Sequence, residues 1–179
     1  MPKKKKKAVV KPIAKLPPGT RILVPLDGSP VAEKALSSAE QMALALQTQV
    51  LLMQVALPLR AAIVASHEVV SPDEAEPLRD ERLNEYMGQL AVDAIERGCE
   101  AEYEVCPVPA SQALLEETRA RLLDLVAQQI LDRAAKSDVG MIVMATHGHS
   151  ARRGTEYGGV AARVLAGSSK PVLLVRVLP

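Results

Sequence analysis

The chain has 179 residues and a formal net charge of +1, and 48% of its residues are hydrophobic. A chain of this length favours one domain with a core of its own. Because Phe and Trp are absent and only three Tyr occur, that core must be built from aliphatic side chains. The near-neutral charge and the scarcity of aromatic rings argue against a specific nucleic-acid partner.

The first 19 residues differ from the rest in composition. Lys3 to Lys7 form an unbroken run of five lysines, and several prolines follow. This pattern is typical of a solvated, disordered tail, and an electrostatic tether to nucleic acid or anionic lipid is the alternative. The lysines are not followed by the apolar segment of a secretion signal, and no apolar run has the length of a membrane span. We therefore divide the chain into a basic tail, residues 1–19, and one α/β domain, residues 20–179.

The first part of the domain predicts a strand, a helix and a second strand. Arg21 to Leu26 is a short apolar run that reads as a buried strand. Ser29 is a strong helix N-cap, Pro30 suits the first helical position, and apolar residues then recur at helical spacing. The run from Gln49 to Ala56 is apolar almost throughout, which is typical of a parallel strand covered on both faces.

The middle of the chain is less regular. A capping-box pattern begins at Ser71, but Pro77 would interrupt a helix that started there, so we expect the helix to begin near Pro77. Gly98 is a good helix stop. Residues 100–108 then alternate between apolar and acidic side chains, which indicates a half-exposed strand near a sheet edge.

The two cysteines, Cys99 and Cys106, flank this predicted strand. They form neither a CxxC pair nor a zinc-binding spacing. We expect free thiols in a reducing, cytoplasmic compartment.

The last third of the chain predicts one long helix followed by a strand, a short helix and a strand. The long helix covers residues 111–136, which is more than a simple crossover needs, so its first half is expected to project or to contact a partner. Val139 to Ala145 is the fourth strand, Val160 to Ala166 the last helix, and Pro171 to Val177 the fifth strand. Strands and helices that alternate in this way are typical of a parallel α/β sheet with right-handed crossovers.

The polar loop between the fourth strand and the last helix is the candidate ligand site, because ligands of such sheets bind at the carboxyl ends of the strands. Gly148, Gly158 and Gly159 would let the backbone approach a phosphate. The N–H groups of Gly158, Gly159 and Val160 would then face the anion at the start of the helix. An ordinary surface loop is the alternative, since neither a P-loop nor a GxGxxG pattern is present.

Other side chains near the carboxyl ends of the strands have both a functional and a structural interpretation. Asp27, at the end of the first strand, would accept hydrogen bonds from an adenine amino group or a ribose hydroxyl, or it would cap the following turn. His147 and His149 lack further ligands at a convincing spacing, so structural or exposed histidines outweigh a metal site. Arg152 and Arg153 would add positive charge to the loop, or they are simply solvated.

Three segments of the chain resemble the universal stress protein family. They are RILVPLDGS at residues 21–29, DVGMIVMATHG at 138–148 and SKPVLLVR at 169–176. The resemblance extends from Arg21 to Val177, and the middle matches only in pattern. It implies an open, Rossmann-like sheet of five parallel strands in the order 3-2-1-4-5, with helices on both faces. It also implies a homodimer paired through the C-terminal strand, Val172 to Val177.

One branch of that family binds ATP through a motif of Gly, two residues, Gly, nine residues, Gly, and then Ser or Thr. Here the motif falls on Ala145, Gly148, Gly158 and Gly159, with the nine-residue spacing intact. Ala145 replaces the first Gly and Gly159 replaces the Ser or Thr. The hydrogen bond lost with that hydroxyl is worth roughly 1 kcal/mol, which is less than a whole site.

The resemblance leads to one principal hypothesis and two alternatives. We expect a cytoplasmic, homodimeric stress-response or regulatory protein that binds ATP or AMP, with Mg²⁺ as an optional partner of the phosphates. The alternatives are an interaction or adaptor protein without a nucleotide, and a slow ATP hydrolase with His147 as the candidate base. We assign no catalytic residue and no metal ligand. The expected nucleotide-binding residues, in which Asp27 and Val55 match the adenine-side positions of the family, are Pro25, Leu26, Asp27, Val55, Met144, Ala145, His147, Gly148, Gly158, Gly159 and Val160.

Overall fold

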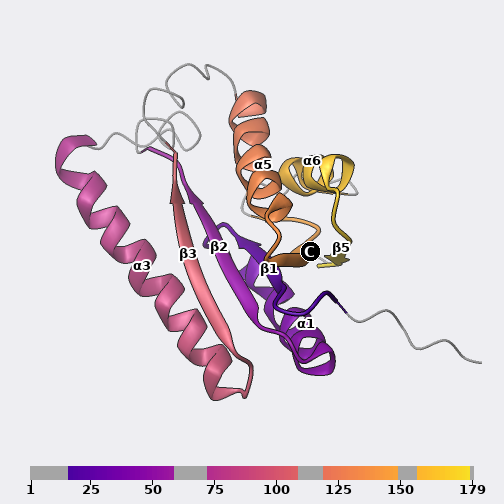
Figure 1. The fold of residues 1–179 in the computed structure, drawn as a ribbon. Helices are drawn as coiled ribbons and strands as arrows, with labels where there is room; N and C mark the ends of the chain where they lie inside the picture. Colours follow the sequence, from indigo (N-terminus) through magenta and orange to yellow (C-terminus); the bar gives the residue numbers. More distant parts are fainter. Residues whose placement is uncertain (1–15, 59–71, 109–118, 149–156, 178–179) are drawn as a thin grey trace, which may run out of the picture.

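The computed structural model describes residues 16–58, 72–108, 119–148 and 157–177. Within these ranges strands and helices alternate along the chain, as predicted (Figure 1). The elements are β1 (Arg21–Leu26), α1 (Pro30–Leu46), β2 (Val50–Ala56), α3 (Pro72–Glu96), β3 (Ala101–Pro107), α5 (Arg119–Ala135), β4 (Val139–Ala145), α6 (Gly159–Gly167) and β5 (Val172–Val175).

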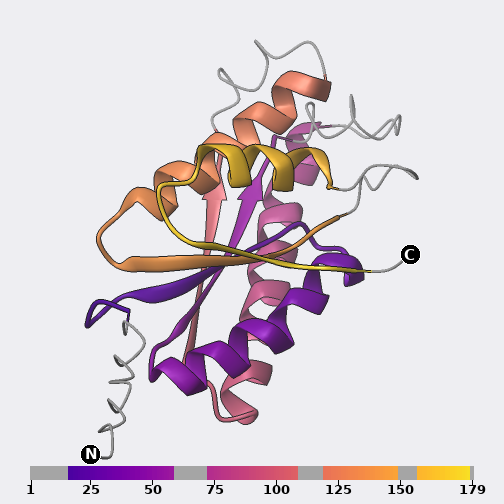
Figure 2. The same ribbon diagram turned by 90° about the vertical axis from the view of Figure 1, so that its right-hand side faces the viewer.

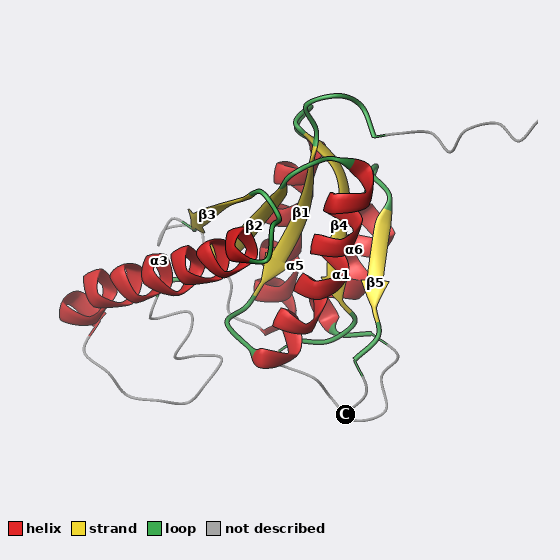
Figure 3. Cartoon of the chain, turned by 90° about the horizontal axis from the view of Figure 1, so that it is seen from below, coloured by secondary structure: helices red, strands yellow, loops and turns green. Residues whose placement is uncertain are grey.

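The five strands form one parallel sheet in the order β3-β2-β1-β4-β5, which confirms the predicted order (Figure 3). The pairing of β1 with β4 shifts by one residue at Gly140, since Arg21 pairs with Val139 and Ile22 with Met141. An ideal Cβ on Gly140 would lie 2.6 Å from Thr20 Oγ1, so only glycine fits there. The strand order reverses between β1 and β4, which is where α/β sheets open a crevice for ligands.

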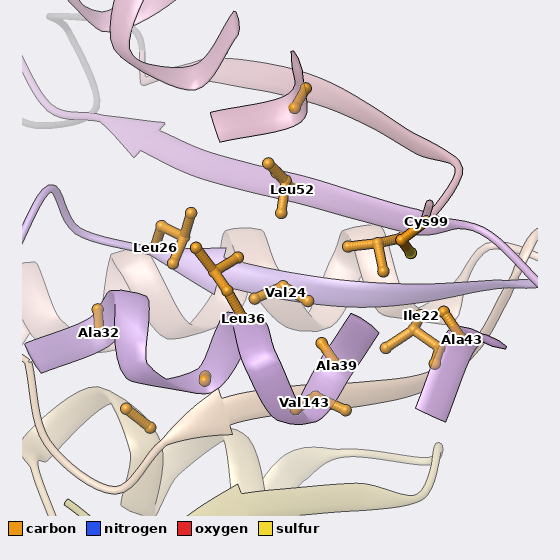
Figure 4. Packing of buried hydrophobic residues seen from close by; sticks show 14 of the residues in the cluster. Ile22, Val24, Leu26, Ala32, Leu36, Ala39, Ala43, Leu52, Cys99 and Val143 are labelled. Carbon is orange, nitrogen blue, oxygen red and sulfur yellow. The ribbon is translucent and has the colours of Figure 1, made fainter. Parts of the chain in front are cut away.

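Helices α1 and α3 cover one face of the sheet. The N-cap predicted at Ser29 is confirmed, because its Oγ accepts a hydrogen bond from the N–H of Ala32 at 3.1 Å and Pro30 opens α1. Small alanine side chains on α1 let the helix approach β1 and β4 closely. Figure 4 shows this contact, in which the side chains of the strands and of α1 interlock: Ile22, Val24, Leu26, Ala32, Leu36, Ala39, Ala43 and Val143.

Helices α5 and α6 cover the opposite face, where they lie side by side (Figure 2). Leu23, Met53 and Ile142 of the sheet pack there against Ile130 of α5 and Val164 of α6. The sheet is therefore covered on both sides, which explains why β4 is buried along its whole length.

The expected start of the second helix was wrong. Helix α3 begins at Pro72, and Pro77 lies inside it. Pro77 removes one backbone hydrogen bond near the N-terminal end of the helix. Further along, Met87, Ala91 and Ala94 bury their side chains against the sheet, and this packing holds the helix in spite of the lost bond.

Other boundaries bear on the predicted tail, long helix and last strand. Leu16, inside the predicted tail, packs against the core, whereas residues 1–15 lie outside the described chain. Helix α5 is described from Arg119, so the predicted first half of the long helix, residues 111–118, lies outside the described residues. Strand β5 has four residues, Val172–Val175, and is shorter than expected.

A chain of charges joins α5 to the edge of the sheet. Arg133, of which 7% is exposed, donates to both carboxylate oxygens of Asp138 at 2.9 and 2.8 Å, and its Nε lies 2.6 Å from Glu104 Oε1. Arg21 also pairs with Asp138 and lies 2.5 Å from Glu102. Hydrogen bonds from Arg133, and then from Arg21, hold the pKa of Asp138 well below its usual range, against the effect of partial burial.

Two other expectations can be compared with the described residues. Cys99 and Cys106 are free thiols, as predicted, and burial raises the pKa of both. None of the helices in the described ranges is both long enough and apolar enough to cross a bilayer.

Candidate ligand site at the carboxyl ends of β1 and β4

A pocket opens at the carboxyl ends of β1 and β4, at the point where the strand order reverses. Its cavity volume is about 80 Å³. The turn after β1 and the first residues after β4, His147 and Gly148, border it, while α1, α5 and α6 line its sides. The lining residues are Pro25, Leu26, Asp27, Ala32, Val126, Ile130, Met144, Ala145, His147, Gly148, Gly158, Gly159, Val160 and Ala161.

All of the residues expected from the sequence line this pocket except Val55. Val55 lies near the end of β2 and packs partly buried against Val108, Leu122 and Leu125. Strand β2 is separated from β4 by β1, so Val55 stands one strand away from the crevice.

Four lining residues were not expected. They are Ala32 of α1, Val126 and Ile130 of α5, and Ala161 of α6. Val126 and Ile130 stand four residues apart in the sequence, which puts them on one face of a helix. Helical periodicity does not specify which end of the sheet a residue covers, so it did not reveal their place in the pocket.

Asp27 holds the turn that follows β1. Its Oδ1 accepts hydrogen bonds from the N–H of Ser29 at 3.1 Å and from Ser29 Oγ at 2.6 Å. Asp27 therefore caps the turn, which was one of its two interpretations, and the same side chain also lines the pocket. Because Ser29 Oγ accepts from Ala32 in turn, Asp27, Ser29 and the start of α1 form one connected unit.

Gly148 brings the loop after β4 against this unit. An ideal Cβ on Gly148 would lie 2.2 Å from Asp27 Oδ2 and 3.0 Å from its Cγ. A side chain at position 148 would therefore displace the Asp27 carboxylate. Glycine is required here for close approach.

Thr146 organises the far side of the pocket, and the sequence analysis did not identify it. It is 5% exposed, and its N–H donates to the carbonyl of Val175 at 2.9 Å. Its carbonyl accepts from the N–H of Gly158 at 2.7 Å, and its Oγ1 accepts from the N–H of Val177 at 3.3 Å. Thr146 Oγ1 also lies 3.1 Å from His147 Nδ1. The only sequence signal was a polar residue placed directly after a fully apolar strand.

The hydrogen bond to Thr146 corrects one expectation. The N–H of Gly158 is engaged within the protein and does not face an anion. Gly158 is the N-cap of α6, and Gly159 and Val160 form the first positions of that helix. N–H groups in a first helical turn have no intrahelical acceptor, so Gly159 and Val160 retain the predicted capacity to face an anion.

The chemistry of the described lining is mostly apolar. Asp27 is its one carboxylate and His147 its one imidazole, and the described lining contains no Lys, Arg, Ser or Thr. No cluster of three or more His, Cys, Asp or Glu suited to a metal ion occurs in the part of the chain that the structure describes. His149, Arg152 and Arg153 lie outside that part.

The fold and the pocket define an α/β protein of the doubly wound class whose candidate ligand site lies at the topological switch point. A family model described as the universal stress protein family matches residues 19–176, and the chain belongs to this family. The resemblance seen in the three sequence segments is thereby confirmed.

Several solved structures share the fold. Hypothetical protein MJ0577 is 22% identical, with a TM-score of 0.64 and coverage of 89% of this chain and 97% of that one. A universal stress protein in complex with cAMP is 18% identical, with a TM-score of 0.54 and coverage of 89% and 98%. The universal stress protein from Archaeoglobus fulgidus in complex with dAMP is 18% identical, with a TM-score of 0.55 and coverage of 87% and 96%. No curated protein sequence matches this chain.

Proposed function

We propose that this protein binds an adenine nucleotide, ATP or AMP, in the pocket between β1 and β4, and that it acts as a homodimeric, cytoplasmic stress-response or regulatory protein. One observation carries the proposal: Asp27, Gly148 and the first turn of α6 meet in a single pocket at the switch point. A carboxylate suited to an adenine amino group or a ribose hydroxyl thus lies near backbone N–H groups suited to a phosphate.

The family supports the ligand class. Two relatives of the same fold were solved with adenine nucleotides, one with cAMP and one with dAMP. In this chain Pro25, Leu26 and Ala145 would border the adenosine, and Gly159 and Val160 the phosphate. Val55 remains a predicted adenine-side residue on the strength of the family resemblance alone.

A magnesium ion has limited support from the described residues. Mg²⁺ is usually bound by one or two carboxylates together with phosphate oxygens and water. The described lining offers one carboxylate, Asp27. Because the proposal places Asp27 at the adenosine, an ion at the phosphates would have no other carboxylate among the described lining residues and would depend on phosphate oxygens and water.

The exposed position of β5 supports the homodimer. β5 lies at the end of the sheet, next to β4. Its four side chains are half-buried and apolar, and an edge strand has a row of backbone groups that a second strand can pair. Pairing of Val172 to Val177 between two copies would cover this edge. Sedimentation equilibrium of the full chain tests it, and a monomer at tens of micromolar would contradict it.

A nucleotide-free interaction protein is the second candidate, and the size of the pocket favours it. Ligand pockets usually enclose roughly 300–1,000 Å³, whereas this cavity has about 80 Å³. A whole nucleotide would therefore extend beyond this cavity. If no nucleotide binds, the surface of the protein rather than the pocket would carry its function.

Calorimetric titration of the full-length protein with AMP and with ATP distinguishes the two candidates. Asp27→Asn is the sharpest variant, because the amide oxygen can still accept from Ser29, while an NH2 donor replaces the second acceptor oxygen and the negative charge is lost. We expect at least tenfold weaker binding, with thermal stability close to that of the wild type. Asp93→Asn, which alters a carboxylate on α3 that accepts from Gln89, is the matched control and should bind normally. Absence of binding at millimolar nucleotide would refute the proposal.

A further inference from the structure

A groove lies at the amino ends of the strands, at the opposite end of the sheet from the ligand pocket. Two adjoining hollows form it, with cavity volumes of about 510 and 380 Å³, and both are lined by Gln49, Gly98 and Glu100. The other lining residues belong to the segment that begins β1, the end of α1, the end of α3 and the start of β3. The ends of α1 and α3 lie there beside the starts of β2 and β3 (Figure 1). We call this surface the amino-end groove.

The amino-end groove combines exposed apolar side chains with carboxylates. Leu44 of α1 is 53% exposed and Ile95 of α3 is 55% exposed. Glu102 pairs with Arg21, which balances its charge. Glu100 is also exposed, and its Oε2 accepts from the amide of Gln49 at 2.7 Å, but it makes no ion pair with any residue that the structure describes. A segment that combines basic with aliphatic side chains would match this surface.

The chain contains such a segment. Residues 1–15, the lysine segment, have seven lysines and no acidic residue. The rest of the chain has 15 Lys and Arg against 21 Asp and Glu, which leaves it a net charge of −6 with His neutral. Eleven of these acids lie in residues 73–104, together with only three arginines, and this stretch forms α3 and β3 beside the groove. The near-neutral total therefore conceals a basic segment and an acidic domain, which attract each other.

The lysine segment joins the domain next to the groove. Leu16 packs against the core, and Gly19, only three residues further along, already lines the groove. Fifteen residues can extend to roughly 50 Å at most, so their reach is ample. A short connection also keeps the segment at an effective concentration on the order of millimolar. Weak contacts are therefore enough to hold it.

We propose that the amino-end groove is the docking surface for the lysine segment of the same chain. Lys11 and Lys15 lie against Glu100, and the aliphatic residues between the lysines cover Leu44 and Ile95. These aliphatic residues are Val9, Val10 and Ile13. Docking then competes with nucleic acid or anionic lipid for the same lysines. The proposal does not depend on the nucleotide function.

Zero-length cross-linking of the full-length protein with a carbodiimide, read by mass spectrometry, tests the contact. At low ionic strength we expect Lys11 or Lys15 to be joined to Glu100 or Glu102 within one chain. In 0.5 M salt the Debye length falls to roughly 4 Å, so the yield of these cross-links should drop severalfold. Protein mixed from unlabelled and ¹⁵N-labelled chains distinguishes a second copy, because its cross-links would join the two isotopes.

The rate of tryptic cleavage after Lys15 tests the same contact by substitution. Glu100→Gln keeps an acceptor oxygen and removes the charge, so we expect cleavage about threefold faster than in the wild type at low ionic strength. Asp132→Asn is the matched control on α5, because Asp132 is also an exposed carboxylate that accepts from a glutamine, Gln128, at 2.7 Å. It does not line the groove and should be cleaved at the wild-type rate.

Each outcome decides for or against the docking. Leu44→Ser should also speed cleavage after Lys15, whereas all variants should be cleaved alike in 0.5 M salt. Equal rates for the wild type and Glu100→Gln at low ionic strength would overturn the proposal, and so would an equal acceleration in Asp132→Asn. Cross-links that join the lysine segment chiefly to acids outside the groove, or chiefly to a second copy, would overturn it as well.

Discussion

Gly148→Ala perturbs the closest contact in the candidate site. The new methyl group would lie 2.2 Å from Asp27 Oδ2, so the carboxylate must rotate away. That rotation breaks the two hydrogen bonds that Asp27 Oδ1 accepts from Ser29. Each contributes on the order of 1 kcal/mol, so we expect a loss of about 2 kcal/mol in the free energy of unfolding. For a chain of this size that loss lowers Tm by about 4–8 °C.

Thermal unfolding followed by circular dichroism measures this loss, and two variants isolate its cause. In Gly158→Ala the new Cβ would have its nearest neighbours at 3.4 Å, so its Tm should fall less. In an Asp27→Ala background the carboxylate is gone, and Gly148→Ala should then cost little. An equal loss of stability from Gly148→Ala with and without Asp27 would refute the reasoning.

Three further outcomes follow from other contacts. Asp138→Asn should lower stability at neutral pH, because Arg133 and Arg21 lose their shared carboxylate. Folding lowers the pKa of Asp138, so the wild type should exceed the variant in free energy of unfolding above about pH 4, and this difference should shrink at lower pH. Urea unfolding measures the difference, and equal values at pH 7 and pH 3 would contradict this. Thr146→Val keeps the shape of the side chain but loses the hydrogen bond to Val177. Chemical denaturation should show a free energy of unfolding lower by about 1 kcal/mol, and no change would mean that this bond is not stabilising. Gln54→Leu should be neutral or stabilising in the same assay, because the buried Oε1 of Gln54 has no hydrogen-bond partner among the described residues; a clear loss of stability would argue against this.

Local patterns were sufficient to predict the sheet and the first helix. The strand Val139–Ala145 was readable because a buried parallel strand is apolar on both faces and ends where polar residues begin. Ser29 and Pro30 act only on their immediate neighbours, so their effect on the start of α1 needs no knowledge of the rest of the fold. The expectation at Pro77 was wrong because its local cost is outweighed by the packing of residues further along the helix, such as Tyr86 and Met87.

The parts of the site that could not be predicted depend on contacts between distant elements. The role of Thr146 follows from where β5 ends, since its partners include Val175 and Val177. Val126 and Ile130 carry no local sign that they will line the pocket, because this depends on how α5 packs beside α6. Strand ends and glycines could be predicted from the sequence. That α5 would form one wall of the pocket could not.

The bonds of Thr146 have a consequence for how the protein opens. Its N–H and its hydroxyl bond to Val175 and Val177 at the end of β5, and its carbonyl bonds to Gly158 at the start of α6. The amide protons of Thr146, Gly158 and Val177 should therefore exchange with solvent through one shared opening rather than three separate ones. The rim of the pocket and the end of the edge strand then form a single cooperative unit, and hydrogen exchange would report their opening as one free energy.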